Sequence, residues 1–386
     1  MQIYLDYSAT TPPHPKAIAL MQQVMAEGWG NPSSLHPWGV RAGTYVEQAR
    51  IAVASLINAP VDSIFFTSGG TEANNTAILG TAHRYETPQH MIISSVEHSA
   101  VAEPVRLLEQ RGWRITRLPV NAQGQVDPDS LAAALRPDTV LVSVIYGQSE
   151  VGTLQPIAAL GKIARDRGVL FHTDAVQVAG RLPIDVQQLP VDLLSLSSHK
   201  LYGPQGAGAL YLRPGTPLFP LLWGGGQEGQ RRSGTQATPA IAGFGVAATL
   251  AQETLETETA RLRRLRDRLR QQLQSEPRLE LTGDPLYRLP HHLSFYLPEG
   301  DGDQLSGKTL VRQLALAGIG ISAGSACHSG KLSPSPILKA MGYSDRAAKC
   351  GIRLTLGRHT TEADVDWTAM VLRQILGRCA PALSVV

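Results

Sequence analysis

Cysteine is scarce in this chain of 386 residues, which contains only three: Cys327, Cys350 and Cys379. A small, odd number of cysteines does not build a disulfide framework and is typical of proteins in a reducing compartment. Cysteine and histidine also never occur at the spacings that bind zinc. The sequence therefore predicts no metal site and a cytoplasmic protein.

Long apolar runs and blocks of one charge are missing as well. The chain has no run of about 18 apolar residues, and residues 1–6 lack the charged and then apolar pattern of a signal peptide. The formal net charge is only +3, without a block of either sign. We therefore expect neither insertion into a membrane nor binding to nucleic acid.

The chain is rich in alternating strand and helix patterns. Apolar residues make up 43% of it, enough for a large core. Strand patterns lie near residues 64, 91, 114, 140, 169, 192 and 208, and helical patterns lie between them. This alternation predicts an α/β fold, in which a mainly parallel seven-stranded sheet is covered by helices and ligands bind beyond the carboxyl ends of the strands.

A chain of this length is too long for one ordinary core. A long helical pattern over residues 240–273 carries acidic residues early and arginines late, which suits the helix dipole. We place a domain boundary inside it, so that residues 15–257 form a large domain. Residues 258–386 read as a small α+β domain with strands near 278–281, 292–297, 319–322 and 351–356 and helices at 304–317 and 362–377.

Lys200 is the first candidate for a chemical role. It ends the polar run 197–200, which follows an apolar strand pattern and precedes the breaker Gly203-Pro204. A partly desolvated lysine loses its proton easily and can form a Schiff base with an aldehyde cofactor. A surface lysine in a turn is the ordinary alternative, so the neighbouring segments decide between the two.

Three other polar segments also follow strand patterns. Asp174 ends one strand, and a carboxylate there suits the ring nitrogen of pyridoxal phosphate. Gly70 and Thr71 stand between a strand and a helix, where backbone amides favour a phosphate. His98 follows a third strand, and its imidazole can lie over a cofactor ring or move protons. Together these residues predict a pyridoxal phosphate site.

With these motifs in place, the sequence resembles the fold-type-I pyridoxal-phosphate enzymes, and among the class-V aminotransferase family the NifS/IscS-like cysteine desulfurases. The resemblance runs nearly end to end. Beyond the segments above it rests on the motifs at 4–12, 30–34, 224–228, 232–235, 324–327 and 352–354. It implies that residues 1–14 join the small domain and that the cofactor is pyridoxal 5'-phosphate.

The resemblance also implies a role for each matching residue. Cys327, Lys200 and His98 are the expected catalytic residues, and Asn31 and Arg353 are expected to bind the carboxylate of L-cysteine. The expected cofactor contacts are Gly70, Thr71, His98, Ser149, Asp174, Gln177, Ser197, Ser198, His199, Lys200 and Thr235, the last from the other subunit of a homodimer. The implied reaction converts L-cysteine to L-alanine and leaves a persulfide on Cys327, which supplies sulfur to an acceptor or iron-sulfur scaffold protein.

Cys327 sits among small residues with His328 beside it, which favours a reactive thiol over a buried, inert one. The long span from Cys327 to Arg353 resembles the branch of the family with a long catalytic loop. Cys350 and Cys379 lack such a setting, and we expect no chemical role for them. One departure concerns Ser149, because relatives carry Asn-Asn-Glu where this chain has Gln-Ser-Glu at 148–150. That cofactor contact is therefore in doubt.

Two further readings of the chain stay open. A C-S lyase or aminotransferase of the same fold needs no cysteine, and a sulfur-carrier or scaffold subunit needs no catalysis at all.

Residues 302–309 also match the phosphate-loop pattern literally. Asp301 and Asp303 would repel a triphosphate there, so we do not expect ATP binding.

Overall fold

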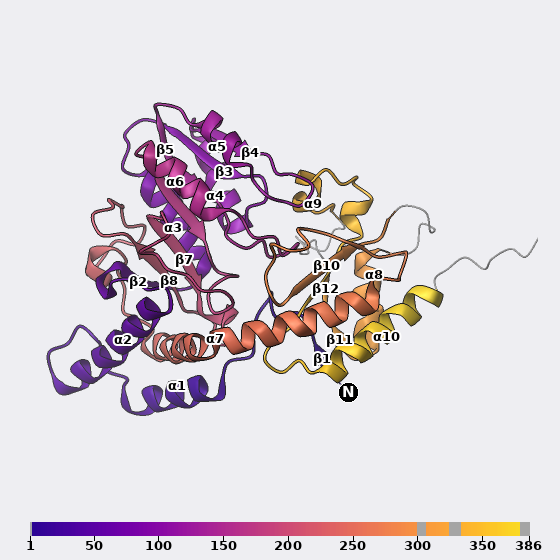
Figure 1. The fold of residues 1–386 in the computed structure, drawn as a ribbon. Coiled ribbons are helices and arrows are strands. Elements are labelled where there is room, and N and C mark those ends of the chain that lie inside the picture. Colours follow the sequence, from indigo (N-terminus) through magenta and orange to yellow (C-terminus); the bar gives the residue numbers. More distant parts are fainter. Residues whose placement is uncertain (1, 299–305, 324–332, 379–386) are drawn as a thin grey trace, which may run out of the picture.

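The computed structural model describes residues 2–298, 306–323 and 333–378. Its largest sheet has seven strands in the order β2-β8-β7-β6-β5-β3-β4 (Figure 1). The strands are β2 Ile64–Thr67, β3 His90–Ser94, β4 Arg114–Leu118, β5 Thr139–Ser143, β6 Leu170–Asp174, β7 Leu193–Ser197 and β8 Gly208–Leu212. All neighbours are parallel except β8, which runs antiparallel to β2 and β7. The predicted α/β fold with a mainly parallel sheet is confirmed.

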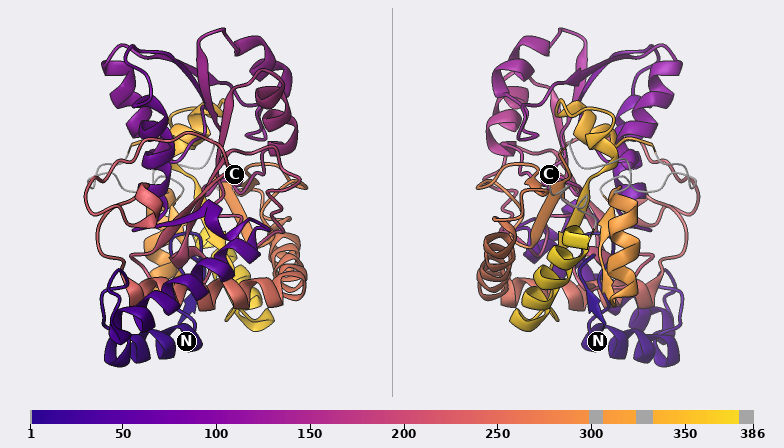
Figure 2. Two further views of the ribbon diagram at one scale, coloured as in Figure 1. Left: turned by 90° about the vertical axis from the view of Figure 1, so that its left-hand side faces the viewer. Right: turned by 90° about the vertical axis from the view of Figure 1, so that its right-hand side faces the viewer.

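Helices cover both faces of this sheet, as the two side views show (Figure 2). Residues that alternate along β3 face opposite cores: Ile92 packs in the cluster with α2, α6 and α7, whereas Ile93 packs in the cluster with α3 and α4. The first helices are α1 Pro15–Glu27, α2 Pro37–Leu56, α3 Gly70–Ala82, α4 Ser99–Gln110, α5 Pro128–Ala134 and α6 Ile157–Asp166. Burial on both faces explains why the strands read as apolar runs.

A second region is built on an antiparallel sheet of four strands in the order β12-β13-β10-β9. Its elements are β9 Glu280–Leu281, β10 His292–Tyr296, α8 Gly307–Leu316, β11 Ile319–Gly320, β12 Ser322–Ala323, α9 Pro336–Ala340, β13 Ile352–Thr355 and α10 Glu362–Arg378. The first strand, β1 Ile3–Tyr4, pairs with β11 in parallel, and Leu5 is buried in the apolar cluster of this region. The first residues of the chain thus pack against this second region.

The helix α7, Thr238–Leu273, runs from beneath the large sheet to the second region and packs against both (Figure 1). Its first half buries Phe244 against the large sheet, and its second half buries Leu265 and Leu269 in the cluster with Leu5. The proposed domain boundary after residue 257 falls inside this helix and stays a prediction. No helix of the described residues is both long enough and apolar enough to cross a membrane.

Residues 306–309 are the part of the phosphate-loop match that the structure describes, and their sequence has a structural explanation. Ser306 caps α8 by accepting a hydrogen bond from the amide of Thr309 at 3.2 Å. A methyl group at Gly307 would lie 2.3 Å from the carbonyl oxygen of Gly351. The glycine is therefore required by a close backbone approach between α8 and the segment before β13. The rest of the match lies outside the described residues.

Candidate active site

Several of the predicted site residues meet where β6, β7 and α3 come together. Asp174 is the last residue of β6, and the neighbouring strand β7 ends at Ser197 and leads into the short 3-10 helix Ser198–Lys200. A methyl group at Gly70 would lie 3.4 Å from Cβ of Ser197. The first turn of α3 therefore faces the end of β7. The parallel topology brings these residues to one edge of the sheet, as their positions after strands predict.

Asp174 is a buried carboxylate whose hydrogen bonds come from neutral groups. Its Oδ2 accepts from the amide nitrogen of Asn74 at 2.7 Å, and its Oδ1 accepts from the backbone N–H of Val176 at 3.0 Å. Its exposed fraction is 4%, and it forms no ion pair with any residue that the structure describes. A buried anion of this kind is costly unless a cation accompanies it. Asp174 is therefore suited to a cationic group of a ligand.

Lys200 is held by the N-terminal segment rather than by an acid. Its Nζ donates to the carbonyl oxygens of Ser8 and Ala9, at 2.7 Å in each case. Burial, with a smaller contribution from the positive charge of Arg353, lowers the pKa of Lys200 to about 8. A lysine amine with this pKa gives up its proton far more easily than an exposed one.

Two histidines lie at the ends of elements in this region. His98 caps α4, and its Nδ1 accepts from the backbone N–H of Ala100 at 3.1 Å, so the neutral ring carries its hydrogen on Nε2. Nδ1 of His199 lies 3.1 Å from the hydroxyl of Thr10. Burial lowers the pKa of His199 to about 4, which keeps that ring neutral. The hydroxyl of Ser198 is buried and has no partner among the described residues.

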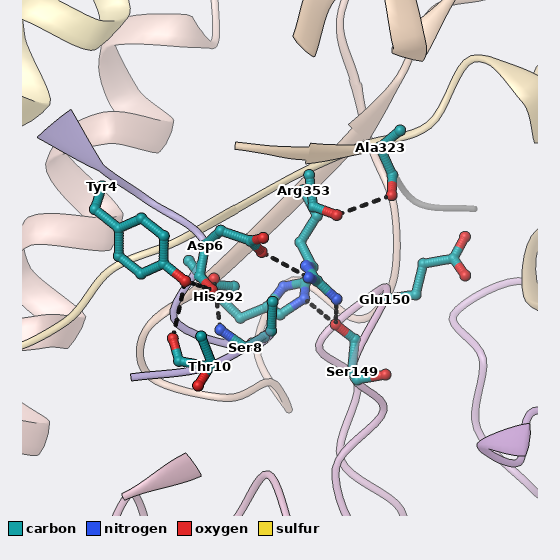
Figure 3. Close-up of polar contacts among 12 residues, drawn as sticks. Tyr4, Asp6, Ser8, Thr10, Ser149, Glu150, His292, Ala323 and Arg353 are labelled. Atoms are coloured by element: carbon teal, nitrogen blue, oxygen red, sulfur yellow. Dashed lines mark hydrogen bonds and ion pairs between the residues drawn. The ribbon is translucent and has the colours of Figure 1, made fainter. Parts of the chain in front are cut away.

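Arg353, on β13, points toward the N-terminal segment (Figure 3). Its Nη2 donates to Oδ1 of Asp6 at 2.7 Å, and its Nη1 donates to the carbonyl oxygen of Ser149 at 3.0 Å. Ring nitrogen Nε2 of His292 lies 3.1 Å from the same carbonyl oxygen. Ser149 thus contacts the site through its backbone, which the change of side chain from Asn leaves intact.

The segment of residues 6–11 is the part of the site that the sequence alone did not reveal. Besides Asp6 at Arg353, the carbonyl oxygen of Ser8 accepts from the side-chain amide of Gln177 at 2.9 Å. Thr11 donates to the carbonyl oxygen of His199 through both its backbone N–H and its hydroxyl. The motif at 4–12 marks this segment in the sequence. The resemblance to the family includes that motif but implies no contact between it and the site.

Two buried glutamates near the site were also missed. Glu97, just before His98, accepts from the hydroxyl of Ser94 and from the backbone N–H of Ile145 through Oε1, and burial raises its pKa to about 8. Glu150 follows Ser149, and burial raises its pKa to about 7. Neither position carries a sequence signal for burial, because glutamate is ordinarily exposed.

Other predicted residues are not brought together within the described chain. Asn31 lies in an exposed loop between α1 and α2, at the left of Figure 1 and away from β10 and β12. Within the described chain it forms no hydrogen bond with Arg353. Thr71 and Thr235 are exposed. Cys327 and Cys379 lie outside the described residues, and burial raises the pKa of Cys350. The roles of these residues, like those of the other predicted site residues, stay predictions.

Residues 3–367 match the family described as aminotransferase class-V. The chain belongs to this family. It is 44% identical to cysteine desulfurase IscS of Dictyoglomus turgidum over 97% of this chain and 94% of that protein. It is 42% identical to cysteine desulfurase IscS of Azotobacter vinelandii over 98% of this chain and 93% of that protein.

Solved structures agree with these relatives. A NifS-like protein has a TM-score of 0.90 and is 34% identical, over 98% of this chain and all of that one (100%). A structure of SspA in complex with cysteine has a TM-score of 0.82 and is 33% identical, over 94% of this chain and 100% of that one. The comparisons confirm the expected family and support cysteine desulfurase activity. They give no support to the lyase, aminotransferase or scaffold alternatives.

Enzymes of this family use pyridoxal phosphate, and the residues present fit that group. Asp174 is a buried anion without an ion pair, which suits a protonated ring nitrogen. Lys200 has a lowered pKa, which suits bonding to an aldehyde. The hydroxyl of Ser198 is buried without a partner in the described structure. Its neighbour Ser197 faces the first turn of α3, where a phosphate would be favoured. The donor set therefore matches a ring, an aldehyde and a phosphate.

Proposed function

We propose that this protein is a pyridoxal-phosphate-dependent cysteine desulfurase that takes sulfur from L-cysteine and releases L-alanine. The observation that carries the proposal is the meeting of Asp174, Lys200 and Ser197 at the ends of β6 and β7, next to the first turn of α3. The binding of cysteine by SspA, a structural relative, supports cysteine as the substrate. When bound, the cofactor withdraws electrons from the Cα atom of the substrate.

The chain's own residues divide the work of holding the cofactor. Asp174 would hold the ring nitrogen, anchored by Asn74 and Val176. Gly70, Thr71, Ser197, Ser198 and His199 are the proposed phosphate contacts, and His98, Ser149 and Gln177 the proposed contacts of the ring and its oxygen. Lys200 would bind the aldehyde carbon, because its lowered pKa makes the neutral amine accessible near neutral pH.

Substrate binding, proton transfer and sulfur transfer are the proposed roles of Arg353, Asn31, Lys200, Cys327 and His98. Arg353 would grip the carboxylate of L-cysteine with its planar fork, with Asn31 as a second donor. Lys200 would move the proton of the substrate Cα. The thiolate of Cys327 would attack the substrate sulfur, so that an S–S bond forms while the C–S bond breaks, and the persulfide stays on Cys327. His98 would help to move the thiol proton.

We propose that the active unit is a cytoplasmic homodimer that passes sulfur to an acceptor or iron-sulfur scaffold protein. Large apolar side chains are exposed along the first two helices and the loop that joins them: Met25, Trp29, Leu35, Trp38 and Val40. Large apolar side chains exposed in such number over neighbouring segments favour an interface there. Thr235, exposed on its own subunit, would then contact the cofactor phosphate of the partner.

The proposed reaction is tested by measuring where the sulfur of L-cysteine goes. Wild-type protein and Cys327→Ala are incubated with L-cysteine, alanine and pyruvate are quantified, and intact mass is measured to detect one added sulfur. The wild type should form alanine and a persulfide on Cys327, whereas the variant should form little alanine and no protein persulfide. Cys350→Ala is the matched control and should behave like the wild type.

Lys200→Ala tests the cofactor assignment in the same preparation. It should lose the visible absorbance of lysine-bound cofactor and the cofactor that borohydride fixes to the protein, whereas Lys162→Ala, an exposed lysine on α6, should keep both. Pyruvate as the main product of the wild type, or full turnover by Cys327→Ala, would refute the desulfurase and leave the lyase.

A further inference from the structure

The guanidinium of Arg353 is already paired with a carboxylate of its own chain. The bond from Nη2 to Oδ1 of Asp6 is 2.7 Å long, and the exposed fractions are only 11% for the Arg353 side chain and 21% for that of Asp6 (Figure 3). A charge-assisted bond of this length, with little water around it, is among the stronger polar contacts in a protein. A substrate carboxylate therefore meets an arginine whose charge is balanced.

The pairing leaves part of the arginine unsatisfied. Nε of Arg353 is buried and donates to no atom in the described structure. Asp6 accepts the hydrogen bond from Nη2 through only one of its two carboxylate oxygens. A carboxylate that approaches a guanidinium with both oxygens satisfies two nitrogens at once. A buried charged donor without a partner costs free energy, so a two-oxygen ligand has an advantage over Asp6.

The backbone on both sides of Asp6 is anchored. Before it, β1 pairs with β11, and the hydroxyl of Tyr4 donates to the carbonyl oxygens of Asp6 at 2.9 Å and Thr10 at 3.0 Å. After it, the backbone N–H of Ser8 donates to the hydroxyl of Thr355 at 2.9 Å. Only the Asp6 side chain is free to turn away from Arg353 while the segment stays in place.

We propose that Asp6 is an internal counter-ion of Arg353 that is exchanged for the α-carboxylate of the substrate. This inference rests on the proposed role of Arg353 in the desulfurase. In the empty site Asp6 balances the arginine, whose buried charge would otherwise be uncompensated. When substrate arrives, the two carboxylates repel one another and Asp6 leaves. Asp6 therefore lowers the affinity for every ligand that binds through a carboxylate.

The test removes the charge of Asp6 and keeps its shape. The holoenzyme and Asp6→Asn are titrated calorimetrically with 3-mercaptopropionate, which has the thiol and the carboxylate of cysteine but no amine to react with the cofactor. The dissociation constant should fall about fivefold in the variant, because a neutral amide holds an arginine less strongly than a carboxylate does. The KM for L-cysteine should fall in parallel, so that the effect lies in KM rather than in kcat.

Two controls isolate the carboxylate. 2-Mercaptoethanol has the thiol but neither a carboxylate nor an amine, and it should bind the wild type and Asp6→Asn equally. Asp62→Asn removes an exposed acid outside the site and should leave the titration with 3-mercaptopropionate unchanged. Thermal unfolding checks that Asp6→Asn is folded, and Asp6→Ser replaces it if it is not.

Unchanged or weaker binding of 3-mercaptopropionate by the folded Asp6 variant would overturn the exchange. Arg353→Gln separates this failure from a failure of the proposed function. If Arg353→Gln weakens binding but Asp6→Asn does not strengthen it, Arg353 is the carboxylate site and only the exchange is wrong. If Arg353→Gln has no effect on binding, the proposed substrate site is wrong as well.

Discussion

Glu97 is a carboxyl group enclosed between the end of β3 and the start of α4. Oε1 accepts from the hydroxyl of Ser94 and from the backbone N–H of Ile145 at 2.9 Å, while Oε2 has no partner among the described residues. Burial raises the pKa of Glu97 to about 8, and the hydrogen bonds offset this only in part. Glu97 is therefore protonated at neutral pH, unlike an exposed glutamate.

This protonation makes stability depend on pH in a defined direction. The folded protein binds a proton on Glu97 from its ordinary pKa of 4.5 up to about 8, where the unfolded chain has released it. The stability that Glu97 contributes is complete below the lower value and is lost as pH rises through the upper one. Glu97→Gln keeps the size of the side chain and does not titrate. Its melting temperature, relative to wild type, should therefore rise between about pH 5 and about pH 8.5.

Glu109→Gln is the control for this experiment, because Glu109 is exposed and its hydrogen bond from Arg117 lowers its pKa. An acid with a lowered pKa loses its contribution only as pH falls through the folded value, so this variant should show a constant difference over the same range. A constant difference for Glu97→Gln as well would show that Glu97 titrates like an ordinary glutamate.

At this scale the sequence locates the residues that stand at the ends of strands. Lys200, Asp174 and Gly70 were predicted because each follows a strand pattern, and parallel topology gathers strand ends. The partners of Arg353 could not be predicted in this way. Asp6 precedes it by almost the whole chain, and the contact arises because β1 packs against β11 and beside β13.

The N-terminal strand is the element that links the two ends of the chain at the site. Leu5 follows β1, its side chain is fully buried in the cluster with Leu265 and Leu354, and its backbone bonds to Gly320 and Thr355. Residues 6–11, which contact Arg353 and Lys200, are held in position by this short stretch. The stability of the N-terminal strand and the position of residues 6–11 in the site therefore both depend on the packing of Leu5.

Leu5→Ala should lower the free energy of unfolding by about 2–5 kcal/mol, because it removes buried methyl groups and leaves a cavity. The variant should also turn over L-cysteine more slowly, since the segment that holds Asp6 loses its anchor. Chemical denaturation measures the first effect, and alanine production measures the second. Leu316→Ala, at a position on α8 that is 90% exposed, is the matched control and should change neither. A loss of less than about 1 kcal/mol for Leu5→Ala would contradict the anchoring role.

The elements themselves were largely predictable, and the differences have local causes. The second helix begins at Pro37, because His36 caps it by accepting from the amide of Gly39. The short helix α9 was missed, although Ser335 followed by Pro336 is an ordinary helix start. A helix of one or two turns has too few residues for a periodic pattern.

At the scale of the whole molecule, the alternation of strands and helices was sufficient for the large sheet. The sequence did not predict that β8 runs antiparallel, because its apolar residues resemble those of the parallel strands of the same sheet. The face with Trp29, Leu35 and Trp38 exposed was not foreseen either. Apolar residues in a helical pattern predict a buried helix face. Only the fold shows which side of a helix has no other element packed against it.

These exposed side chains offer a test of the proposed dimer. Trp38→Asp places a charge on the first turn of α2, where the side chain is 51% exposed. If this face is the interface, burying the new carboxylate is costly and the dimer should dissociate. Light scattering after size exclusion should then report a monomer.

Dissociation has a second, chemical consequence, because Thr235 is proposed to reach the cofactor phosphate of the partner. The monomeric variant should retain less pyridoxal phosphate, which the ratio of visible to ultraviolet absorbance measures. Leu316→Asp places the same charge on α8, where the side chain is 90% exposed and belongs to the other region of the molecule, and should leave the dimer and its cofactor intact. A Trp38→Asp protein that stays dimeric would place the interface elsewhere. A monomer that keeps its full complement of cofactor would show instead that each subunit holds the phosphate alone.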